Sequence, residues 1–293
     1  MASTQLLRRR IRSVRNTQQI TKAMELVAAA KMRRVQSAVE GARIYGQTAM
    51  DVLARLAASP EATQNPYFSP ASAKAKLYVI ITSDTGLAGA FNANILNLAH
   101  QQFKADKAAG VKSRVIAIGK KGAHHMSHLY DVELIGEYEN MPDNPDTNVF
   151  APLIETMHGA VTGGYISQVQ IIYTQFVSSL NQKAVVETLV PIKPAGGDQP
   201  ETRSVPANFV YEFEPDLEVV LEEALRVYLE SALRRGRVES AASEHASRML
   251  SMNNANRNAG DLIDNLTLEL NATRQAAITQ EMAEIIGGAD AIA

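Results

Sequence analysis

Apolar side chains recur at helical spacing over two long stretches, one at each end of the chain. In the second stretch they stand three or four positions apart, an average of about 3.5 residues, which is typical of a coiled-coil seam. These positions are Met249, Met252, Ala255, Ala259, Leu262, Leu266 and Leu270. The pattern predicts one helix from about Thr4 to Ala57 and another from about Asp216 to Ile286.

The first stretch carries a similar seam in two parts. Its longer part comprises Met32, Val35, Val39, Ala42, Tyr45, Ala49, Leu53 and Leu56. Two earlier runs follow the same rule in another phase: Leu7, Ile11 and Val14, then Ile20, Met24 and Val27. A change of phase indicates local unwinding of a supercoil, so we expect one in the first helix.

The middle of the chain alternates short β-branched runs with helix-forming ones. We expect a strand over each of the first kind and a helix over each of the second. The expected strands are Leu77–Thr82, Arg114–Ile118, Val132–Tyr138 and Val169–Phe176, and the expected helices are Ala88–Lys107, Lys120–Leu129 and about Val149–Val161. This alternation predicts βαβ units and a mainly parallel sheet.

The end of the middle segment differs from the rest. The run Val169–Ile192 contains two strand-like halves around residues 178–182, which predicts a hairpin and an antiparallel sheet edge. A loop is expected over Pro191–Pro206. The predicted fold class is α/β, with a long antiparallel coiled coil of the N- and C-terminal helices and a central Rossmann-like domain. The expected divisions are residues 1–59, 60–215 and 216–293.

Proline usage supports the two long helices. All 11 prolines lie between Pro60 and Pro215. Proline inside a helix costs about 3 kcal/mol, so long proline-free ends are what long helices require. At about 1.5 Å per residue each helix is longer than a small domain is wide, and a helix of that length needs a partner along its apolar stripe. The simplest arrangement pairs the two ends with each other.

The two ends carry opposite charge, although the whole chain is nearly neutral at a net charge of -2. Residues 1–59 have a net charge of +8 and residues 216–293 a net charge of -6, which favours their pairing. The basic charge is densest near the start, at Arg8, Arg9, Arg10, Arg12 and Arg15. This cluster is either a solvated, salt-bridged face or a surface for an acidic partner, whether protein, nucleic acid or lipid headgroup.

No cofactor or catalytic motif is present in the middle segment. The turn Ser83–Asn92 has glycines three apart, but neither G-x-G-x-x-G nor G-x-x-x-x-G-K-[ST] occurs. We therefore expect no bound cofactor, and interpret the glycines, including those of Gly119–Gly122, as turn and close-packing positions. The chain has no cysteine, which excludes thiol catalysis and thiolate metal sites. No run of about 18 apolar residues predicts a membrane span.

A histidine group is the remaining candidate for a metal site. His124 and His128 stand at i, i+4 on an expected helix, with His125 between them. No glutamate completes the H-E-x-x-H pattern and no carboxylate shares the turn. Exposed histidines are therefore the preferred interpretation, and no metal is expected.

Three segments together resemble one known family. The segments Arg10–Arg34 (RIRSVRNTQQITKAMELVAAAKMRR), Thr82–Asn92 (TSDTGLAGAFN) and Glu239–Ala289 closely resemble the gamma subunit of rotary F-type ATP synthases. The resemblance implies a central rotor shaft that is itself not catalytic. It implies the alpha, beta and epsilon subunits and the membrane rotor ring of c subunits as partners. It also implies a peripheral place at the cytoplasmic face of a bacterial membrane.

The resemblance assigns roles to individual positions. A polar catch on a beta-subunit loop is implied for Arg274 and Gln275, with Thr279 and Glu281 nearby, and a coupling contact for Met24 and Arg248. The implied bearing comprises Arg8, Arg9, Arg10, Ile285 and Ile286, and the implied foot on the rotor ring comprises Phe209, Tyr211, Phe213 and Glu214. An ordinary intrahelical ion pair is the alternative role for Arg274.

The central turn departs from the family pattern. The family usually reads S-D-R-G-L-C-G-G, and here Thr85, Ala88 and Ala90 replace the arginine, the cysteine and the second glycine. A second ionic catch near Asn97 and His100 is therefore not implied. Two other functions stay as alternatives: a nucleic-acid-binding rod that uses the basic first helix, and a Rossmann-type enzyme that lacks the usual glycine fingerprint.

Overall fold

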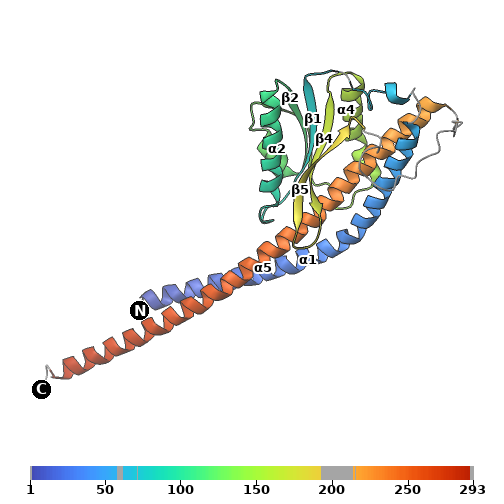
Figure 1. The fold of residues 1–293 in the computed structure, drawn as a ribbon. Coiled ribbons are helices and arrows are strands. Elements are labelled where there is room, and N and C mark those ends of the chain that lie inside the picture. The colour runs from blue at the N-terminus through green and yellow to red at the C-terminus, as the bar shows by residue number, and fades with distance from the viewer. Residues whose placement is uncertain (1, 58–61, 71, 193–213, 215, 291–293) are drawn as a thin grey trace. The chain divides into compact units, whose positions relative to one another are not determined.

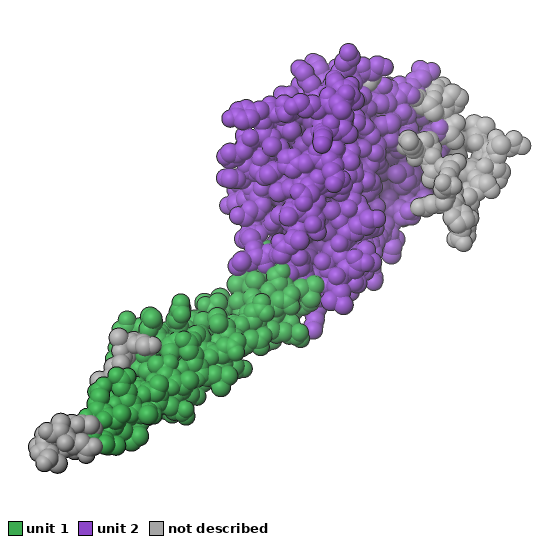
Figure 2. Space-filling view, turned by 60° about the vertical axis from the view of Figure 1, so that its left-hand side comes forward, with its two compact units in different colours: residues 1–29, 248–293 green, residues 30–247 purple. Residues whose placement is uncertain are grey.

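The computed structural model describes residues 2–57, 62–70, 72–192, 214 and 216–290. They form two compact units, which Figure 2 colours separately. Residues 30–247 make up the larger one, here called the body, and residues 1–29 with 248–293 make up the smaller one, here called the coil. The long helices α1 (Ala2–Leu56) and α5 (Leu217–Asp290) each contribute to both units.

The body is built on a five-stranded sheet. Its strands are β1 (Ala75–Ile81), β2 (Lys112–Ile118), β3 (Val132–Tyr138), β4 (Gln168–Phe176) and β5 (Gln182–Val190), in the order β3-β2-β1-β4-β5. The first four are parallel and β5 pairs antiparallel with β4. Both the mainly parallel sheet and the hairpin edge are therefore confirmed.

Helices cover both faces of this sheet because its central strands are apolar on both sides. On one face α2 (Phe91–Ala108) packs Phe91, Ile95 and Ala99 against Tyr78 and Ile80. On the other face α4 (Ala151–Thr162) joins the body segments of α1 and α5 over Val79, Ile81 and Ile171. The short helix α3 (Lys120–Met126) connects β2 to β3.

Within the body, α1 and α5 run antiparallel and side by side (Figure 1). The Arg43 side chain of α1 bonds Glu239 of α5, and the Gly46 position faces Arg235. Residue numbers of the contacting pairs rise along α1 as they fall along α5, which confirms the predicted antiparallel arrangement. At Gly236 α5 lies close against the sheet, since a Cβ there would lie 2.7 Å from Ile171 Cδ1.

The coil shows the same antiparallel pairing. Gln18 donates to the Asn256 carbonyl at 3.5 Å, and Asn253 donates to Glu25 at 3.1 Å. Thr21, one turn after Gln18, is only 8% exposed. Polar side chains thus occupy part of the helix interface, where the sequence pattern predicts only apolar ones.

The expected phase change in α1 is wrong. The positions turned inward along α1 keep one continuous spacing of three or four residues: 7, 11, 14, 18, 21, 25, 28, 32, 35, 39, 42, 46, 49, 53 and 56. Ile20 and Val27 are about 60% exposed and lie on the outer side, and Tyr45 is exposed because Gly46 takes its place in the seam. On α5 Leu262 is likewise exposed and the half-buried Ile263 takes its place in the seam, whereas Ala255 and Asn256 are both half-buried.

Several element boundaries also differ from expectation. The helix expected from Ala88 begins at Phe91, because Leu87 and Gly89 have positive φ angles that interrupt a right-handed helix. The helix expected to reach Leu129 ends at Met126. Most of the loop expected over Pro191–Pro206 lies outside the described residues.

Candidate functional site

The last four turns of α5 form an exposed helical surface in the coil. From Asn271 to Ile286 only Thr273 and Ala277 are even partly covered. The pairing of Glu25 with Asn253 and Gln18 with Asn256 places residues near 272 opposite the first described turn of α1. Beyond that point the described chain offers α5 no partner helix, although a helix of this length is stabilised by packing.

The predicted catch residues all lie on this surface. Arg274, Gln275, Thr279 and Glu281 are exposed, and Thr279 Oγ1 donates to the Gln275 carbonyl at 2.9 Å. Arg274 has no ion pair with any described residue, and its helical neighbours at i±3 and i±4 are Leu270, Asn271, Ala277 and Ile278. The alternative role of Arg274 in an intrahelical pair is therefore wrong. Its guanidinium is free to bind a carboxylate elsewhere.

Apolar side chains accompany the polar ones on the same turns. Ile278, Met282, Ile285 and Ile286 are each about half exposed or more, up to 72% at Ile285. An exposed apolar stretch with a polar border is typical of a protein-binding surface. The end of α5 therefore has the composition of a contact surface rather than that of a solvated helix.

The basic start of α1 belongs to the coil as well. Arg8, Arg9 and Arg10 are exposed, as are Arg12 and Arg15. None of the five makes an ion pair with a described residue of α5, so the predicted attraction between oppositely charged ends is not realised at these positions. No hydrogen bond joins Arg8, Arg9 or Arg10 to the described part of α5 near Ile285 and Ile286 either.

The predicted coupling residues differ in accessibility. Met24 is half-buried, between the exposed Ile20 and Val27 at helical spacing, so these three form an apolar stripe on the outer side of α1. Arg248 is only 8% exposed. Next to Met24, burial favours a higher pKa for Glu25, but hydrogen bonds from Lys22 and Asn253 and the charges of Lys22 and Arg257 outweigh it and lower that pKa.

The predicted foot falls mostly outside the described residues. Phe209, Tyr211 and Phe213 lie there, and Glu214 is exposed. Its assignment to a rotor ring therefore stays a prediction.

The sheet has a point where a doubly wound fold would bind a ligand, between the carboxyl ends of β1 and β4, where the strand order reverses. Here the turn after β1 uses its polar groups internally. The Ser83 amide donates to Asn92 Oδ1 at 3.0 Å, and Asn92 Nδ2 donates to Ser83 Oγ at 2.8 Å. From α5, Ser247 Oγ donates to the Ala88 carbonyl at 2.8 Å. Helix α5 thus lies against the turn that phosphate would contact in a nucleotide-binding relative of this fold.

Close packing explains the glycine after β2. Gly119 has φ +97°, and a Cβ there would lie 2.3 Å from the Thr82 carbonyl oxygen. The interpretation of this glycine as a close-packing position is confirmed.

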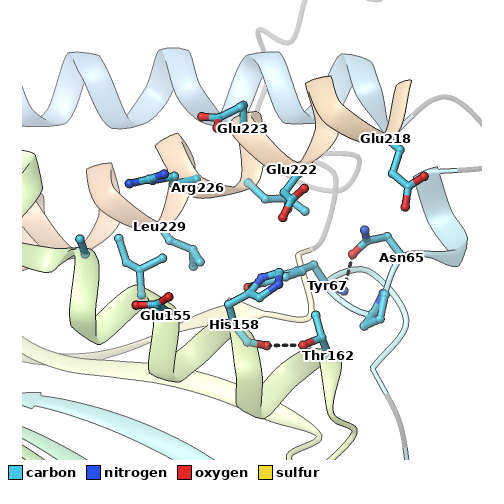
Figure 3. Close-up of a pocket in the computed structure, with 14 residues that line it drawn as sticks. Asn65, Tyr67, Glu155, His158, Thr162, Glu218, Glu222, Glu223, Arg226 and Leu229 are labelled. Atoms are coloured by element: carbon cyan, nitrogen blue, oxygen red, sulfur yellow. Dashed lines mark hydrogen bonds between the residues drawn. The ribbon is translucent and has the colours of Figure 1, made fainter. Parts of the chain in front are cut away.

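The body also has an acidic cavity of about 550 Å³ between α4 and α5 (Figure 3). Its lining includes four acidic residues, Glu155, Glu218, Glu222 and Glu223. The Tyr67 hydroxyl and His158 Nδ1 form a hydrogen bond of 3.1 Å there. Burial, and then the charge of Glu222, raises the pKa of Tyr67. No three histidine, aspartate or glutamate residues of the described chain lie where they could hold one metal ion.

The histidines are arranged differently from the predicted pair. His124 and His128 are exposed, as expected, and their rings lie with centroids 4.7 Å apart at an interplanar angle of 36°. His125 is half-buried and its Nε2 lies 2.7 Å from Nε2 of His100 on α2, so the expectation that it is exposed is wrong. Burial, and then the charges of neighbouring histidines, lowers the pKa of His125.

Comparison with known sequences assigns the chain to a family. A family model described as ATP synthase matches residues 3–292. The ATP synthase gamma chains of Pelotomaculum thermopropionicum and Clostridium acetobutylicum are 39% and 37% identical to it, over 100% and 98% of this chain and 100% and 97% of theirs. This chain belongs to the ATP synthase gamma chain family. The nucleic-acid-binding alternative receives no support from these relatives.

Solved structures show that this gamma-family chain shares their fold. A chain of the Euglena gracilis mitochondrial ATP synthase, in its OSCP/F1/c-ring structure, matches with a TM-score of 0.69 at 19% identity, over 99% of this chain and 95% of that one. A chain of the Tetrahymena thermophila central stalk and c-ring structure matches with a TM-score of 0.60 at 24% identity, over 80% and 99%. No helix in the described part of the gamma-family chain is long and apolar enough to span a membrane.

Two charged residues of the body, Arg43 and Glu239, were not predicted as functional from the sequence. Glu239 is 1% exposed, and its carboxylate binds Arg43 Nε at 2.8 Å and the Phe176 amide at 3.0 Å. Glu239 lies among Val238, Ala241 and Ala242, and an acid among apolar residues was the available signal, since a buried charge needs a partner.

Proposed function

We propose that this chain is the central shaft of a rotary ATP synthase and has no catalytic role of its own. Full-length similarity to ATP synthase gamma chains carries the proposal, and the structural neighbours come from assemblies whose titles name a central stalk and a c-ring. The alpha and beta subunits, the epsilon subunit and the c-ring are its proposed partners. The proposed place is peripheral, at the cytoplasmic face of a bacterial membrane.

In this proposal the shaft acts by differential contact. A binding partner shifts a conformational equilibrium only if it contacts the two states differently. A helix pair has unlike faces, so when it turns inside three identical beta subunits it presents a different face to each. Ion flow through the membrane ring turns the shaft during synthesis, and ATP hydrolysis turns it in the opposite direction.

The exposed surfaces of the coil are the proposed contacts with the alpha and beta subunits. The guanidinium of Arg274, which pairs with no described residue, is the proposed catch on a beta-subunit loop, together with Gln275, Thr279 and Glu281. Ile285 and Ile286, with Arg8, Arg9 and Arg10, form the proposed bearing, where apolar side chains make few directional bonds that rotation would break. Met24 and Arg248 are the proposed coupling contact.

The central domain is the proposed foot. Residues 60–215 would contact the epsilon subunit and the c-ring, the latter through Phe209, Tyr211, Phe213 and Glu214. Residues 1–59 and 216–293 would then supply the shaft. This division follows chain order, whereas the two compact units divide each long helix between them.

Purification from membranes tests the proposal. The chain, carrying an affinity tag in the hairpin turn at Leu180, which is 77% exposed, is isolated from mildly solubilised membranes, and its partner chains are identified by mass. We expect alpha, beta, epsilon and c subunits, and ATP hydrolysis that rotates a probe fixed to the body. Recovery without beta subunits, or hydrolysis in the complex without rotation of the probe, would contradict the proposal.

A further inference from the structure

Strand β4 extends beyond its parallel neighbour in the body. The pairing of β1 with β4 ends at Ile80 and Ile172, whereas β4 continues to Phe176. Thr174 and Phe176 are two residues apart, so their backbone groups face the same edge of the strand. No strand of the described chain lies beside that edge at these positions, and buried backbone groups require other partners.

Side chains of the two long helices supply all four partners. The Thr174 amide donates to Ser240 Oγ at 3.1 Å, and Ser243 Oγ donates to the Thr174 carbonyl at 3.3 Å. The Phe176 amide donates to Glu239 Oε2 at 3.0 Å, and Arg43 Nη2 donates to the Phe176 carbonyl at 2.7 Å. Three of these side chains come from α5 and one from α1.

Arg43 and Glu239 also bind each other, which closes a ring of contacts around Phe176. Arg43 Nε donates to Glu239 Oε1 at 2.8 Å. The Glu239 side chain is 2% exposed, so water does not compete for it, whereas Arg43 is 44% exposed. One guanidinium and one carboxylate thereby join α1, α5 and β4 through charge-assisted bonds, which are directional.

A second connection reinforces the first on the neighbouring strand. Arg235 of α5 pairs with Glu187 of β5, and the Tyr173 hydroxyl donates to the same carboxylate at 3.2 Å. Other side chains of α5 join the apolar core on this face of the sheet, for example Leu229 and Leu233. Apolar contacts are non-directional and resist small rotations of a helix less than oriented ion pairs do.

We propose that the Arg43–Glu239 pair on Phe176 is a mechanical joint that stiffens the connection between the long helices and the sheet against torsion. This inference rests on the proposed shaft function, because only a rotating shaft transmits torque through these helices. Arg43 and Glu239 are positioning residues in it. Neither contacts substrate, and both act by holding α1 and α5 in one orientation on β4.

Single-molecule torsional stiffness tests the joint in the assembled complex. The alpha–beta ring is fixed to a surface, a probe is attached to the body, and the angular variance of the probe is measured while the motor is stalled without nucleotide. In Arg43→Gln we expect the variance to rise roughly twofold, because the ring around Phe176 loses its charge-assisted bonds. ATP hydrolysis without load should stay unchanged. The matched control is Arg55→Gln, an exposed arginine of α1 that makes no ion pair with a described residue.

Glu239→Gln is the second variant, which retains an acceptor for the Phe176 amide and decides the question if Arg43→Gln does not assemble. A raised variance with native hydrolysis supports the joint, since a residue that served only stability would lower the yield or the melting temperature instead. A variance equal to that of Arg55→Gln in both variants overturns the joint and leaves the shaft function intact. If the native complex does not rotate the probe at all, the shaft function itself fails.

Discussion

At the residue scale, ion pairs of the body join elements that are distant in sequence. Asp143, in the segment after β3, binds His245 Nε2 at 2.9 Å and Arg237 Nη2 at 3.2 Å, both from α5. Burial alone would raise the pKa of Asp143. The hydrogen bond and charge of His245, together with the charges of Arg237 and Lys31, outweigh burial and lower this pKa.

A lowered carboxylate pKa predicts a definite pH dependence. The unfolded chain binds the proton of Asp143 near the ordinary pKa of 3.8, and the folded chain binds it only at lower pH. The stabilisation is complete above that value and is lost as the pH falls through the folded pKa. In Asp143→Asn we expect a loss of about 1–3 kcal/mol at pH 7 and a weaker decline of stability on acidification.

Urea unfolding of the isolated chain between neutral and acid pH measures both effects. Asp131→Asn serves as the control, because Asp131 is 67% exposed and its pair with Lys107 is solvated. Exposed pairs contribute about 1 kcal/mol or less, so this variant should stay near native stability. Equal losses in the two variants would contradict the role given to Asp143.

Arg274 makes the sharpest residue-level prediction for the assembled complex. Arg274→Ala should lower ATP hydrolysis about tenfold without dissociating the complex, because a charge-assisted contact with a beta subunit contributes roughly 1.5–3 kcal/mol. The rate is measured on complexes whose subunit content has been checked. Asn271→Ala, also exposed and one turn away, should retain native turnover. Native turnover in a correctly assembled Arg274→Ala complex would refute the catch assignment.

At the scale of elements, α1 shows how a heptad pattern persists through polar residues. Gln18, Thr21 and Glu25 take seam positions in the coil and bond Asn256, Gln18 and Asn253 respectively. Polar residues in a seam commonly fix the register of paired helices at some cost in stability. The apolar residues next to them, Ile20 and Val27, therefore lie outside, where they are available to a partner.

Two glycines inside the long helices give a matched prediction. A Cβ at Gly41 would meet nothing within 4 Å, whereas a Cβ at Gly236 would meet Ile171 Cδ1 at 2.7 Å and Ile81 Cδ1 at 3.2 Å. Gly41→Ala should therefore stabilise the chain by up to about 1 kcal/mol through helix propensity alone. Gly236→Ala should cancel that gain and destabilise by about 1–3 kcal/mol, because Ile171 must move in a packed core.

This prediction is tested by comparing the denaturant midpoint of each variant with that of the native chain. Similar gains for both glycines would show that α5 does not press on the sheet at Gly236.

The elements were predictable from sequence where one local signal sufficed. The proline-free ends predicted both long helices, and the β-branched runs predicted every strand of the sheet. The seam of α1 could not be predicted fully, because the burial of Gln18 and Glu25 depends on asparagines more than 200 positions away. The Arg43–Glu239 pair could not be predicted from sequence for the same reason, since only the fold brings these residues to Phe176.

At the scale of the whole molecule, the body combines a ligand-binding type of sheet with a helix placed where a ligand would bind. The strand order reverses between β1 and β4, and doubly wound folds bind ligands at such points. In this chain Ser240 and Ser243 of α5 bond the end of β4, and Ser247 bonds the turn after β1. Backbone polar groups at the end of β4 and in the turn after β1 thus bind a helix in this chain.

Because α5 lies where a ligand would bind, we predict that the purified chain neither hydrolyses ATP nor binds it. Binding at the carboxyl ends of β1 and β4 would require α5 to release its bonds to Thr174 and Ala88, along with its apolar contacts to the sheet. The site has no phosphate-binding glycine motif, so the free energy of nucleotide binding would not offset this cost. Equilibrium dialysis with labelled ATP at up to about 100 µM, a concentration at which a micromolar site would be nearly filled, should detect no saturable binding. The complex with alpha and beta subunits, dialysed in parallel, provides the positive control. Saturable binding by the chain alone, abolished by a substitution in the Ser83–Asn92 turn, would support the Rossmann-type enzyme alternative. It would also contradict the interpretation that α5 occupies the ligand-binding position at the carboxyl ends of β1 and β4.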